Sequence, residues 1–373
     1  MRVVLLADRR FASRERSMLA RLQVGLADEG IRVVLALPRG FERSDEGLFG
    51  QTVDFEETGL PLSLSWRASE VATRLRSTEK TGEDPARIVH VFGGSLWPFG
   101  LALAERLDAA LILEVWRSGL VRQAQRLVSK ASGRAGTLIV CADSAIAAQC
   151  VHDIPGVQVR HSPWGVYADK PLGEVFRPGA AWSVMIAGAG FDKGAFTACF
   201  EAIADIVREH PDMLVFADAV AARRADLWKL AEKLGVRSQV SLVDEMDANR
   251  DLVLRGDVLV LPEARGEQRT LVLEAMSVGM PVVAARDDFN TALIDERSAL
   301  LVTPGDRQGW SRQLRRLFGE GGRRADSIEE LIVSAHEFVA TEHRPSRHVG
   351  GVIEAYEAAV GKPSIPFPGA DTR

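Results

Sequence analysis

An arginine and a glutamate stand five residues apart, Arg269 and Glu274, where the sequence predicts the start of a helix. The preceding residues, Val258–Leu261, form an apolar strand, and a polar loop separates it from the helix. Free N–H groups and the positive end of the helix dipole favour an anion at Thr270 and Leu271, where Arg269 adds a fixed charge. The carboxylate one turn further in suits a vicinal diol such as a ribose. The spacing predicts a nucleotide site, and a solvated surface helix is the alternative.

Two apolar stretches flank that helix and must hold it in place. Val258–Leu261 precedes the helix, and Pro281–Ala285 follows it after Gly279. A strand, a helix and a second strand in this order form a βαβ unit with parallel strands. Ligands of such sheets bind at the carboxyl ends of strands. The same alternation runs through both halves of the chain, which predicts an α/β protein with two doubly wound domains.

This stretch resembles the family 4 (group 1) retaining glycosyltransferases of the GT-B fold. In that family a strand ends in Pro and is followed by Glu-x7-Glu, then by Ala-Met-x-x-Gly and Pro-Val-Val. The residues that match in register are Pro262, Glu274-Ala275-Met276, Gly279 and Pro281-Val282-Val283. The first glutamate of the pattern falls on Gly266, with Glu267 one place later. Either a shifted loop lets Glu267 contact the donor sugar, or the contact is absent.

The resemblance implies two Rossmann-like domains that face a cleft. It places an acceptor domain at residues 1–168, a nucleotide-sugar donor domain at 180–342, and a helix that crosses back to the first domain at 343–361. The implied enzyme is a hexosyltransferase. It moves a sugar from a nucleoside diphosphate to an acceptor with retention, in polysaccharide or glycoconjugate biosynthesis. The implied acceptor is a glycan, a lipid-linked molecule or a small molecule.

The residues that the resemblance assigns to the donor are Gly188, Lys193, Gly266, Arg269, Thr270, Leu271 and Glu274. Glu274 takes the ribose hydroxyls, while Lys193, Arg269 and the helix end stabilise the pyrophosphate. Charge builds on the leaving phosphate as the glycosidic bond breaks, so Lys193 and Arg269 are expected to be catalytic together with Glu267. The family has Gly-Arg where this chain has Gly188-Ala189, and Arg269 is expected to supply the lost charge. The alternative for Lys193 is an ordinary surface turn.

Four residues of the first half are expected to line an acceptor or sugar pocket: Trp116, Gly93, Gly94 and Arg14. Trp116 follows an apolar strand at a place where the family often has a histidine, and its ring suits stacking on a sugar or base. The paired glycines allow backbone to approach a ligand closely. Arg14 shares a loop with Arg9, Arg10 and Arg16. These arginines bind an anionic acceptor or phosphate, or they are simply solvated.

Composition excludes several classes of protein. The chain has 373 residues, 46% of them hydrophobic and 26% charged, which is typical of a globular protein with two domains. A net charge of −5 gives no footprint for nucleic acid. Three cysteines are too few for a disulfide framework, and no apolar run reaches the roughly eighteen residues of a membrane span. A cytoplasmic protein is expected. No cofactor or metal is expected either, because the resemblance implies a retaining enzyme that needs no metal and the sequence has no Asp-x-Asp cluster.

A basic segment directly follows Trp116. Residues 117–134 contain five basic residues and no acidic ones, and Arg122, Arg126 and Lys130 stand four apart. A basic amphipathic helix of this kind can lie on an anionic membrane, which would place the protein at the inner membrane face. The alternative is a solvated cationic face on a packed helix.

Two other functions fit parts of the sequence. Trp116, Ala189 and Gly266 replace residues at three functional positions of the family, as in a non-catalytic nucleotide-sugar-binding module of the same fold. An epimerase acting on a nucleotide sugar shares the fold as well, but the carboxylates that its acid/base chemistry needs are not evident in the sequence. Transfer of a sugar is the function that the register of the motif favours.

Overall fold

The structure is a computed structural model of the whole chain, and the residues that it describes are 1–41, 51–57, 63–77, 85–131, 136–169, 172–173, 175–177, 180–318 and 326–361. The chain divides into two compact units. Unit 1 comprises Met1–Gly165 and Pro345–Arg373, and unit 2 comprises Val166–Arg344.

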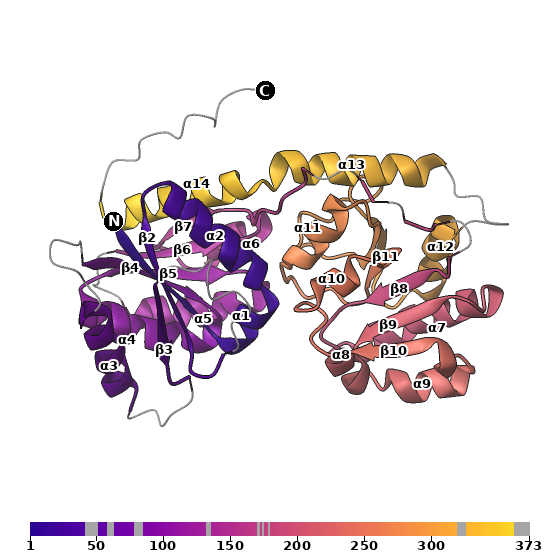
Figure 1. Cartoon of the computed structure of the whole chain (residues 1–373), viewed down its shortest axis with the longest axis horizontal. Helices are drawn as coiled ribbons and strands as arrows, with labels where there is room; N and C mark the ends of the chain where they lie inside the picture. Colours follow the sequence, from indigo (N-terminus) through magenta and orange to yellow (C-terminus); the bar gives the residue numbers. More distant parts are fainter. Residues whose placement is uncertain are drawn as a thin grey trace. The chain divides into compact units, whose positions relative to one another are not determined.

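Unit 1 is built on a parallel sheet with the strand order β3-β2-β1-β4-β5-β6-β7 among the described residues (Figure 1). Its strands are β1 (Arg2–Ala7), β2 (Arg32–Pro38), β3 (Gln51–Phe55), β4 (Ala86–Phe92), β5 (Ala110–Val115), β6 (Thr137–Cys141) and β7 (Gln158–His161). Its helices are α1 (Arg9–Arg14), α2 (Arg16–Asp28), α3 (Leu64–Ser77), α4 (Trp97–Leu107), α5 (Val121–Lys130), α6 (Ser144–Asp153) and α14 (Pro345–Ala359), with short 3-10 turns η2 (Gly94–Leu96) and η3 (Ser118–Leu120). The strand order reverses between β1 and β4, which is where such sheets bind ligands.

Unit 2 repeats the design with the parallel strand order β10-β9-β8-β11-β12-β13 among its described residues. Its strands are β8 (Ser183–Ile186), β9 (Leu214–Asp218), β10 (Val240–Val243), β11 (Val258–Leu261), β12 (Val282–Ala285) and β13 (Leu300–Val302). Its helices are α7 (Lys193–Glu209), α8 (Ala219–Arg224), α9 (Leu227–Leu234), α10 (Arg250–Val253), α11 (Thr270–Ser277), α12 (Arg307–Phe318) and α13 (Asp326–Glu342), with the turn η4 (Arg237–Gln239). The order reverses between β8 and β11.

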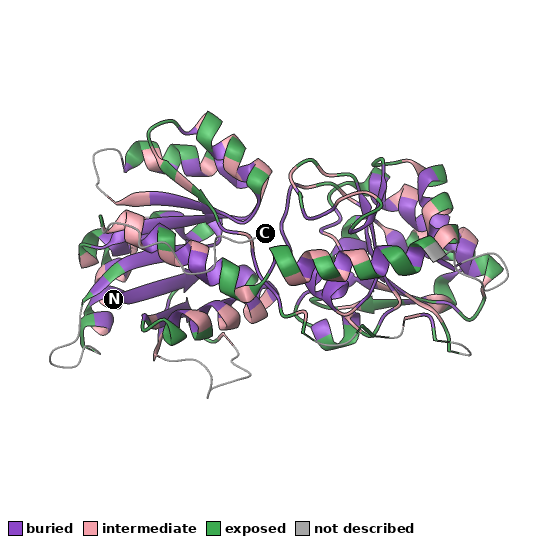
Figure 2. Cartoon of the chain, turned by 90° about the horizontal axis from the view of Figure 1, so that it is seen from above, coloured by how far each residue is buried: buried purple, intermediate pink, exposed green. Residues whose placement is uncertain are grey.

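The cores explain why these segments are strands. Every residue of β1, β11 and β12 is buried, as expected for parallel strands covered by helices on both faces (Figure 2). In unit 2, Phe196 and Phe200 of α7 pack into the same core as Trp310 of α12. Burying each such side chain contributes about 1.5–3 kcal/mol to folding. The prediction of two doubly wound Rossmann-like domains is confirmed.

Aspartates fix where several helices begin. Asp8 follows β1 and accepts a hydrogen bond from the N–H of Phe11 at 2.7 Å, and Asp192 caps α7 through the N–H of Ala195 at 2.9 Å. Such caps satisfy N–H groups that the first helical turn leaves without partners. Helix α11 differs from these two helices. The residue before its first turn is Arg269, and no side chain caps it. Its amino end therefore keeps the polarity that attracts an anion.

Helix α14 belongs to unit 1, where it packs on α2 and on β5, β6 and β7. The helices approach closely at Gly25, where an added Cβ would stand 2.4 Å from a methyl group of Val349. Ser162 donates a hydrogen bond to the carbonyl of His348 at 3.0 Å. Helix α13, which precedes α14, packs on α11 in unit 2 and covers it.

Candidate functional site

Unit 2 has a pocket at the carboxyl ends of β8, β11 and β12, on both sides of the point where its strand order reverses. Its polar lining consists of Glu263, Arg265, Glu267, Arg269, Asp287 and Asn290. The free space is about 40 Å³, enough for a few water molecules. Two arginines and three carboxylates line it, so most of the charge is already compensated inside the protein.

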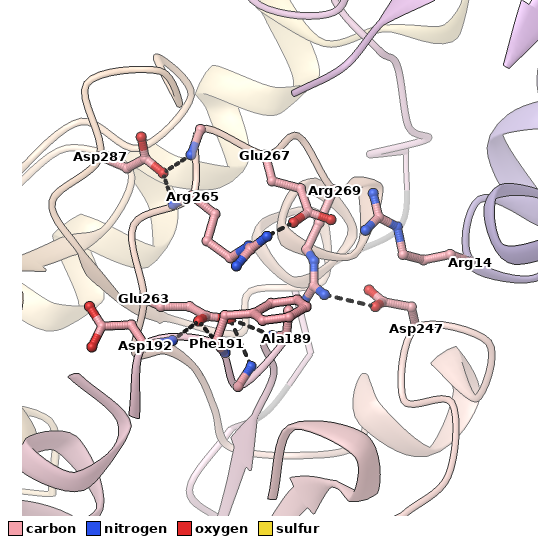
Figure 3. A network of polar contacts seen from close by, with 12 residues as sticks. Arg14, Ala189, Phe191, Asp192, Asp247, Glu263, Arg265, Glu267, Arg269 and Asp287 are labelled. Carbon is pink, nitrogen blue, oxygen red and sulfur yellow. Dashed lines mark hydrogen bonds and ion pairs between the residues drawn. The ribbon is translucent and has the colours of Figure 1, made fainter. Parts of the chain in front are cut away.

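Glu263 fills the backbone cradle that this fold offers to a phosphate. Its Oε1 accepts hydrogen bonds from the N–H groups of Ala189 at 2.5 Å and Gly190 at 3.0 Å, and its Oε2 from Phe191 at 3.1 Å and Asp192 at 3.0 Å (Figure 3). Four consecutive N–H groups before the amino end of α7 are a typical anion site. Here the anion is a side chain of the same unit.

Asp287 accepts hydrogen bonds from backbone N–H groups of the neighbouring loop, which follows β11. Its Oδ2 accepts hydrogen bonds from the N–H groups of Arg265 at 2.7 Å and Gly266 at 2.6 Å, and its Oδ1 accepts from Phe289 at 3.0 Å (Figure 3). Glu263 follows β11 and Asp287 follows β12. Each loop at the strand ends is therefore held by a carboxylate from the next strand of the sheet.

The side chain of Arg265 contacts both Phe191 and Glu267. Its guanidinium lies 4.5 Å from the ring centroid of Phe191, and Arg224 lies 4.3 Å from the same ring. Arg265 also forms an ion pair with Glu267 at 3.5 Å (Figure 3). A partly exposed aromatic ring in contact with two guanidinium groups is stabilised by cation–π attraction of about 0.5–1 kcal/mol each.

Behind the pocket, α11 is anchored by two buried ion pairs. The guanidinium of Arg269 lies 3.2 Å from Asp247, and that of Arg250 lies 2.6 Å from Glu274. Arg250 also donates to the backbone carbonyl of Asp247 at 2.8 Å, which joins the two pairs into one network. The side chains of Glu274 and Arg250 are only 11% and 9% exposed. Removing one member of such a pair leaves an uncompensated buried charge.

The structure brings together some of the predicted donor residues. Gly188, Glu267 and Arg269 line the pocket. Gly266 lies in the adjacent loop with a φ of 56°, a left-handed conformation that glycine adopts without strain. Thr270, Leu271 and Glu274 lie on α11, whose eight residues are all buried. The alternative of a solvated surface helix is therefore wrong.

Lys193 lies elsewhere. Its side chain is 58% exposed, and its ammonium contacts the carboxylate of Asp226 rather than lining the pocket. This contact holds the pKa of Asp226 below its ordinary value through the hydrogen bond and the charge of Lys193. In this structure Lys193 occupies the surface position that was its alternative.

Unit 1 has a larger pocket at the carboxyl ends of β1, β4 and β5, with about 350 Å³ of free space. All four residues predicted for an acceptor or sugar pocket line it, namely Arg14, Gly93, Gly94 and Trp116. Gly93 has a φ of 98°, and a Cβ there would stand 2.0 Å from the carboxylate of Asp8. Only glycine fits that place. Asp8 also accepts a hydrogen bond from Ser95 at 2.7 Å.

The ring of Trp116 is not an open platform. It is 8% exposed, the guanidinium of Arg14 lies 4.3 Å from its centroid, and that of Arg117 lies 5.4 Å away. Phe11 packs against the same ring at 5.8 Å. The indole N–H of Trp116 is buried and has no acceptor among the described residues. This wall of the pocket can contact a ligand through charge and hydrogen bonding more than through stacking.

His90 is a core residue of β4. It is fully buried, and its two ring nitrogens lie 3.0 Å from the hydroxyl of Tyr356 and 3.1 Å from Glu114. Glu114 also accepts a hydrogen bond from the indole of Trp164 at 2.8 Å. Burial, with a smaller contribution from Glu114, raises the pKa of Tyr356, so the phenol stays protonated and ties α14 to the sheet.

Sequence reasoning missed several residues of both pockets. Glu263, Arg265 and Asp287 in unit 2 and Arg117 in unit 1 carry much of the charge. A usable signal was present, because each of them stands one to four residues past the end of a buried strand. The partners of the α11 ion pairs, Asp247 and Arg250, had no such signal, since they lie on a different element.

Two Rossmann-like units with a charged pocket at each reversal of strand order define a doubly wound α/β protein. Residues 184–320 match the family model described as "Glycosyl transferases group 1". This segment, which contains both the Glu263 cradle and α11, belongs to the group 1 glycosyltransferases.

Two individual glycosyltransferases are similar in sequence to part of this chain. D-inositol 3-phosphate glycosyltransferase of Salinispora tropica is 36% identical over 146 residues, which is 38% of this chain and 29% of that protein. The lipopolysaccharide core biosynthesis glycosyltransferase LpsE of Rhizobium meliloti is 26% identical over 153 residues, which is 41% of this chain and 44% of that protein. The chain thus spans less than half the length of these curated relatives.

A solved structure extends the likeness in fold to both units. HepE of Anabaena, determined in complex with UDP and glucose, superposes with a TM-score of 0.72 at 12% identity and covers 95% of this chain and 99% of its own. At that identity the likeness concerns the fold. Among the described residues, no helix is long and apolar enough to cross a membrane, and no cluster of three or more His, Cys, Asp or Glu side chains is arranged to hold a metal ion.

Proposed function

We propose that the protein is a retaining glycosyltransferase that moves a hexosyl group from a nucleoside diphosphate to an acceptor, in polysaccharide or glycoconjugate biosynthesis. The observation that carries this proposal is the build of α11. The helix begins at Thr270, directly after Arg269, without a side-chain cap, and Glu274 one turn further in is held by Arg250 at 2.6 Å. These features lie inside the segment that belongs to the group 1 glycosyltransferases.

The donor chemistry follows from that arrangement. The diphosphate binds at the amino end of α11 beside Arg269, where the helix dipole and the guanidinium stabilise the charge that develops on the leaving phosphate. Glu274 binds the ribose hydroxyls. Because Arg250 keeps the Glu274 carboxylate oriented, little conformational entropy is lost when the ribose binds. HepE was determined with UDP, which makes UDP the first nucleotide to test.

Lys193 and Glu267 have roles that need movement. Lys193 must leave Asp226 before it contacts a diphosphate, and Glu267 must leave Arg265 before it contacts a sugar. Lys193 would exchange a carboxylate for a phosphate, whereas Glu267 would exchange an ion pair for hydrogen bonds to the hydroxyl groups of the sugar. We propose that they accompany donor binding, and that the reaction needs no metal because the arginines neutralise the diphosphate.

Peripheral membrane contact through α5 is also proposed. Arg122, Arg126 and Lys130 are exposed, whereas Val121 and Leu127 are buried in unit 1. The apolar side of α5 is thus used for packing, and only electrostatic attraction to anionic lipids, about 1 kcal/mol for each basic residue near the surface, is left. Loss of sedimentation with anionic liposomes in Arg122→Gln/Arg126→Gln would support it, and no binding of the wild type at low salt would exclude it.

A second candidate is a nucleotide-sugar-binding module without catalytic activity. The observation that favours it is the occupied cradle at Ala189–Asp192, together with the exposed position of Lys193. The two functions differ in turnover. We expect a transferase to hydrolyse UDP-hexose slowly without acceptor, and NMR detection of free hexose and UDP checks this. Tight UDP binding with no hydrolysis and no transfer to any acceptor would identify the module.

A further inference from the structure

Two arginines of unit 2 lie against the loop in which this chain has Ala189. The guanidinium of Arg224 donates a hydrogen bond to the carbonyl of Ala189 at 2.9 Å and lies 4.3 Å from the ring centroid of Phe191. The guanidinium of Arg265 lies 4.5 Å from the same centroid (Figure 3). We propose that Arg224 and Arg265 bind the terminal phosphate of the diphosphate leaving group. The inference rests on the proposed function, because it names two residues of the same donor site.

The backbone of this loop cannot itself hold a phosphate while Glu263 occupies it. The N–H groups of residues 189–192 all donate to the two oxygens of Glu263, over distances of 2.5–3.1 Å. A phosphate oxygen that approaches the loop therefore finds its N–H donors in use and a carboxylate behind them. Cationic side chains must supply the contact instead. Guanidinium groups suit this role, because they bind phosphate oxygens through paired donors.

Arg224 brings a charge to the position where the family has an arginine and this chain has Ala189. It is an exposed residue of α8, and no carboxylate of the described residues forms an ion pair with it. Its hydrogen bond goes to a neutral carbonyl, so its charge is not compensated. Arg286, another exposed arginine of unit 2, pairs with Asp295 at 2.6 Å. Arg224 thus retains its charge for an anion that comes from outside the protein.

Arg265 lines the pocket of unit 2 and keeps its donors available. Its side chain is 24% exposed, and no nitrogen of its guanidinium makes a hydrogen bond within the described residues. Its ion pair with Glu267 joins Nε at 3.5 Å, and this pair opens when Glu267 turns to the sugar as proposed above. Arg269 differs, because it is 9% exposed and pairs with Asp247 at 3.2 Å. Of the two pocket arginines, Arg265 therefore has more donors left for a ligand.

Phe191 orders both guanidinium groups before a ligand arrives. Its ring is 57% exposed, and each cation–π contact with it is attractive. Two positive groups beside one ring repel each other, and a bound phosphate relieves that repulsion. Since the side chains are already ordered, binding costs little conformational entropy. The same contacts stabilise the negative charge that grows on the leaving phosphate as the glycosidic bond breaks.

Isothermal titration calorimetry of the full chain with UDP and UMP tests the proposal, because the two nucleotides differ by the terminal phosphate. We expect the wild type to bind UDP at least tenfold more tightly than UMP. Arg224→Gln and Arg265→Gln should each lose most of this preference, since a lost hydrogen bond to a charged group weakens binding about tenfold or more. Arg265→Lys keeps the charge without the paired donors and should retain part of the preference.

Arg237→Gln is the matched control. Arg237 lies 4.9 Å from the ring centroid of Trp228 and pairs with Glu232 at 3.2 Å, but it does not line the pocket of unit 2. This variant should keep the preference of the wild type.

Three results would overturn the inference. They are equal binding of UDP and UMP by the wild type, an unchanged preference in both glutamine variants, and equal losses of UDP and UMP affinity in those variants, which would show a structural role alone. Failure of the proposed donor site gives a different result, because the wild type then binds neither nucleotide.

Discussion

The two pockets occupy equivalent positions in their sheets, but only one of them is open. In unit 1, where β1 and β4 meet, about 350 Å³ is free, and three arginines and two carboxylates line the space. In unit 2, where β8 and β11 meet, about 40 Å³ is free, and two arginines and three carboxylates line it. The fold places a pocket at the carboxyl ends of the strands in both units. Side chains that follow the neighbouring strands decide whether that position is empty.

This difference has a consequence for donor binding. A pocket of about 40 Å³ is far below the roughly 300 Å³ of a small-molecule site, so the donor binding that we propose for unit 2 requires its loops to move. The groups in the way are ion pairs such as Arg265–Glu267 and the carboxylate of Glu263. The pocket of unit 1 already has about 350 Å³ of free space.

Glu274→Ala is expected to have the largest effect, because it leaves Arg250 buried without its ionic partner. The free energy of unfolding should fall by about 3–5 kcal/mol, measured by equilibrium urea denaturation. A double variant, Arg250→Met/Glu274→Leu, removes both charges and should recover most of this loss. If Glu274→Ala costs no more than an exposed substitution such as Arg160→Gln, the pair is not the buried anchor of α11.

Glu263→Ala should empty the cradle of unit 2 and make it resemble the open pocket of unit 1. The loss of one acceptor for four N–H groups, two of them at exposed positions, should lower stability by about 1–2 kcal/mol. Inorganic phosphate should restore it, by about 2.7 kcal/mol at a hundred times its dissociation constant.

Thermal melting with and without phosphate checks this, with Glu263→Gln as the control that keeps an acceptor in place. Because Glu263 excludes phosphate from the cradle, the wild type should gain less than Glu263→Ala. Equal gains in both proteins would mean that Glu263 does not occupy a phosphate position.

Acid should lower the free energy of unfolding of unit 1 through His348 of α14. Burial lowers the pKa of His348 to about 3, with smaller contributions from His90 and Arg21. The unfolded chain takes up a proton near pH 6.5, but the folded protein does not until about pH 3. Stability therefore falls as the pH drops below 6.5, by about 1.4 kcal/mol per pH unit for this group. In urea denaturation at several pH values, the free energy of unfolding of His348→Gln should fall less steeply with decreasing pH than that of the wild type. Parallel curves for the two proteins would contradict this prediction.

Trp116→Phe is expected to have the smallest effect on the free protein. The substitution keeps the ring between its neighbours and removes a buried N–H that has no acceptor among the described residues. Stability should stay within about 0.5 kcal/mol of the wild type or rise slightly, in calorimetric melts. A loss of several kcal/mol would show that the N–H has a structural partner.

The sequence was sufficient where local pattern decides structure. The strand Val258–Leu261 was predicted with the bounds that it has, and the helix after it, Thr270–Ser277, ends before Gly279 as expected. The composition of α11 is apolar enough to be buried on all sides, yet Glu274 and Arg269 led to a surface helix as the alternative. Their partners, Arg250 and Asp247, lie about twenty residues away, and only the fold brings them together.

The filled cradle shows the same limit more clearly. Gly188 and Gly190 lie in the loop before α7, but nothing in the sequence of that loop shows that its N–H groups are hydrogen-bonded to Glu263. Glu263 is more than seventy residues away, and its role depends on the pairing of β11 with β8. Unit 1 was easier to predict, because Gly93, Gly94 and Trp116 directly follow strands of a single sheet and Arg14 lies on α1, the helix that follows β1.

The claim that matters most is that unit 2 binds a nucleoside diphosphate at the amino end of α11, with Glu274 on the ribose. The most direct measurement is the shift in thermal unfolding on addition of UDP, compared between the wild type and Glu274→Gln, which keeps the size of the side chain. At a hundred times its dissociation constant, UDP should stabilise the wild type by about 2.7 kcal/mol, and Glu274→Gln should lose this response. An equal response in both proteins would contradict the account.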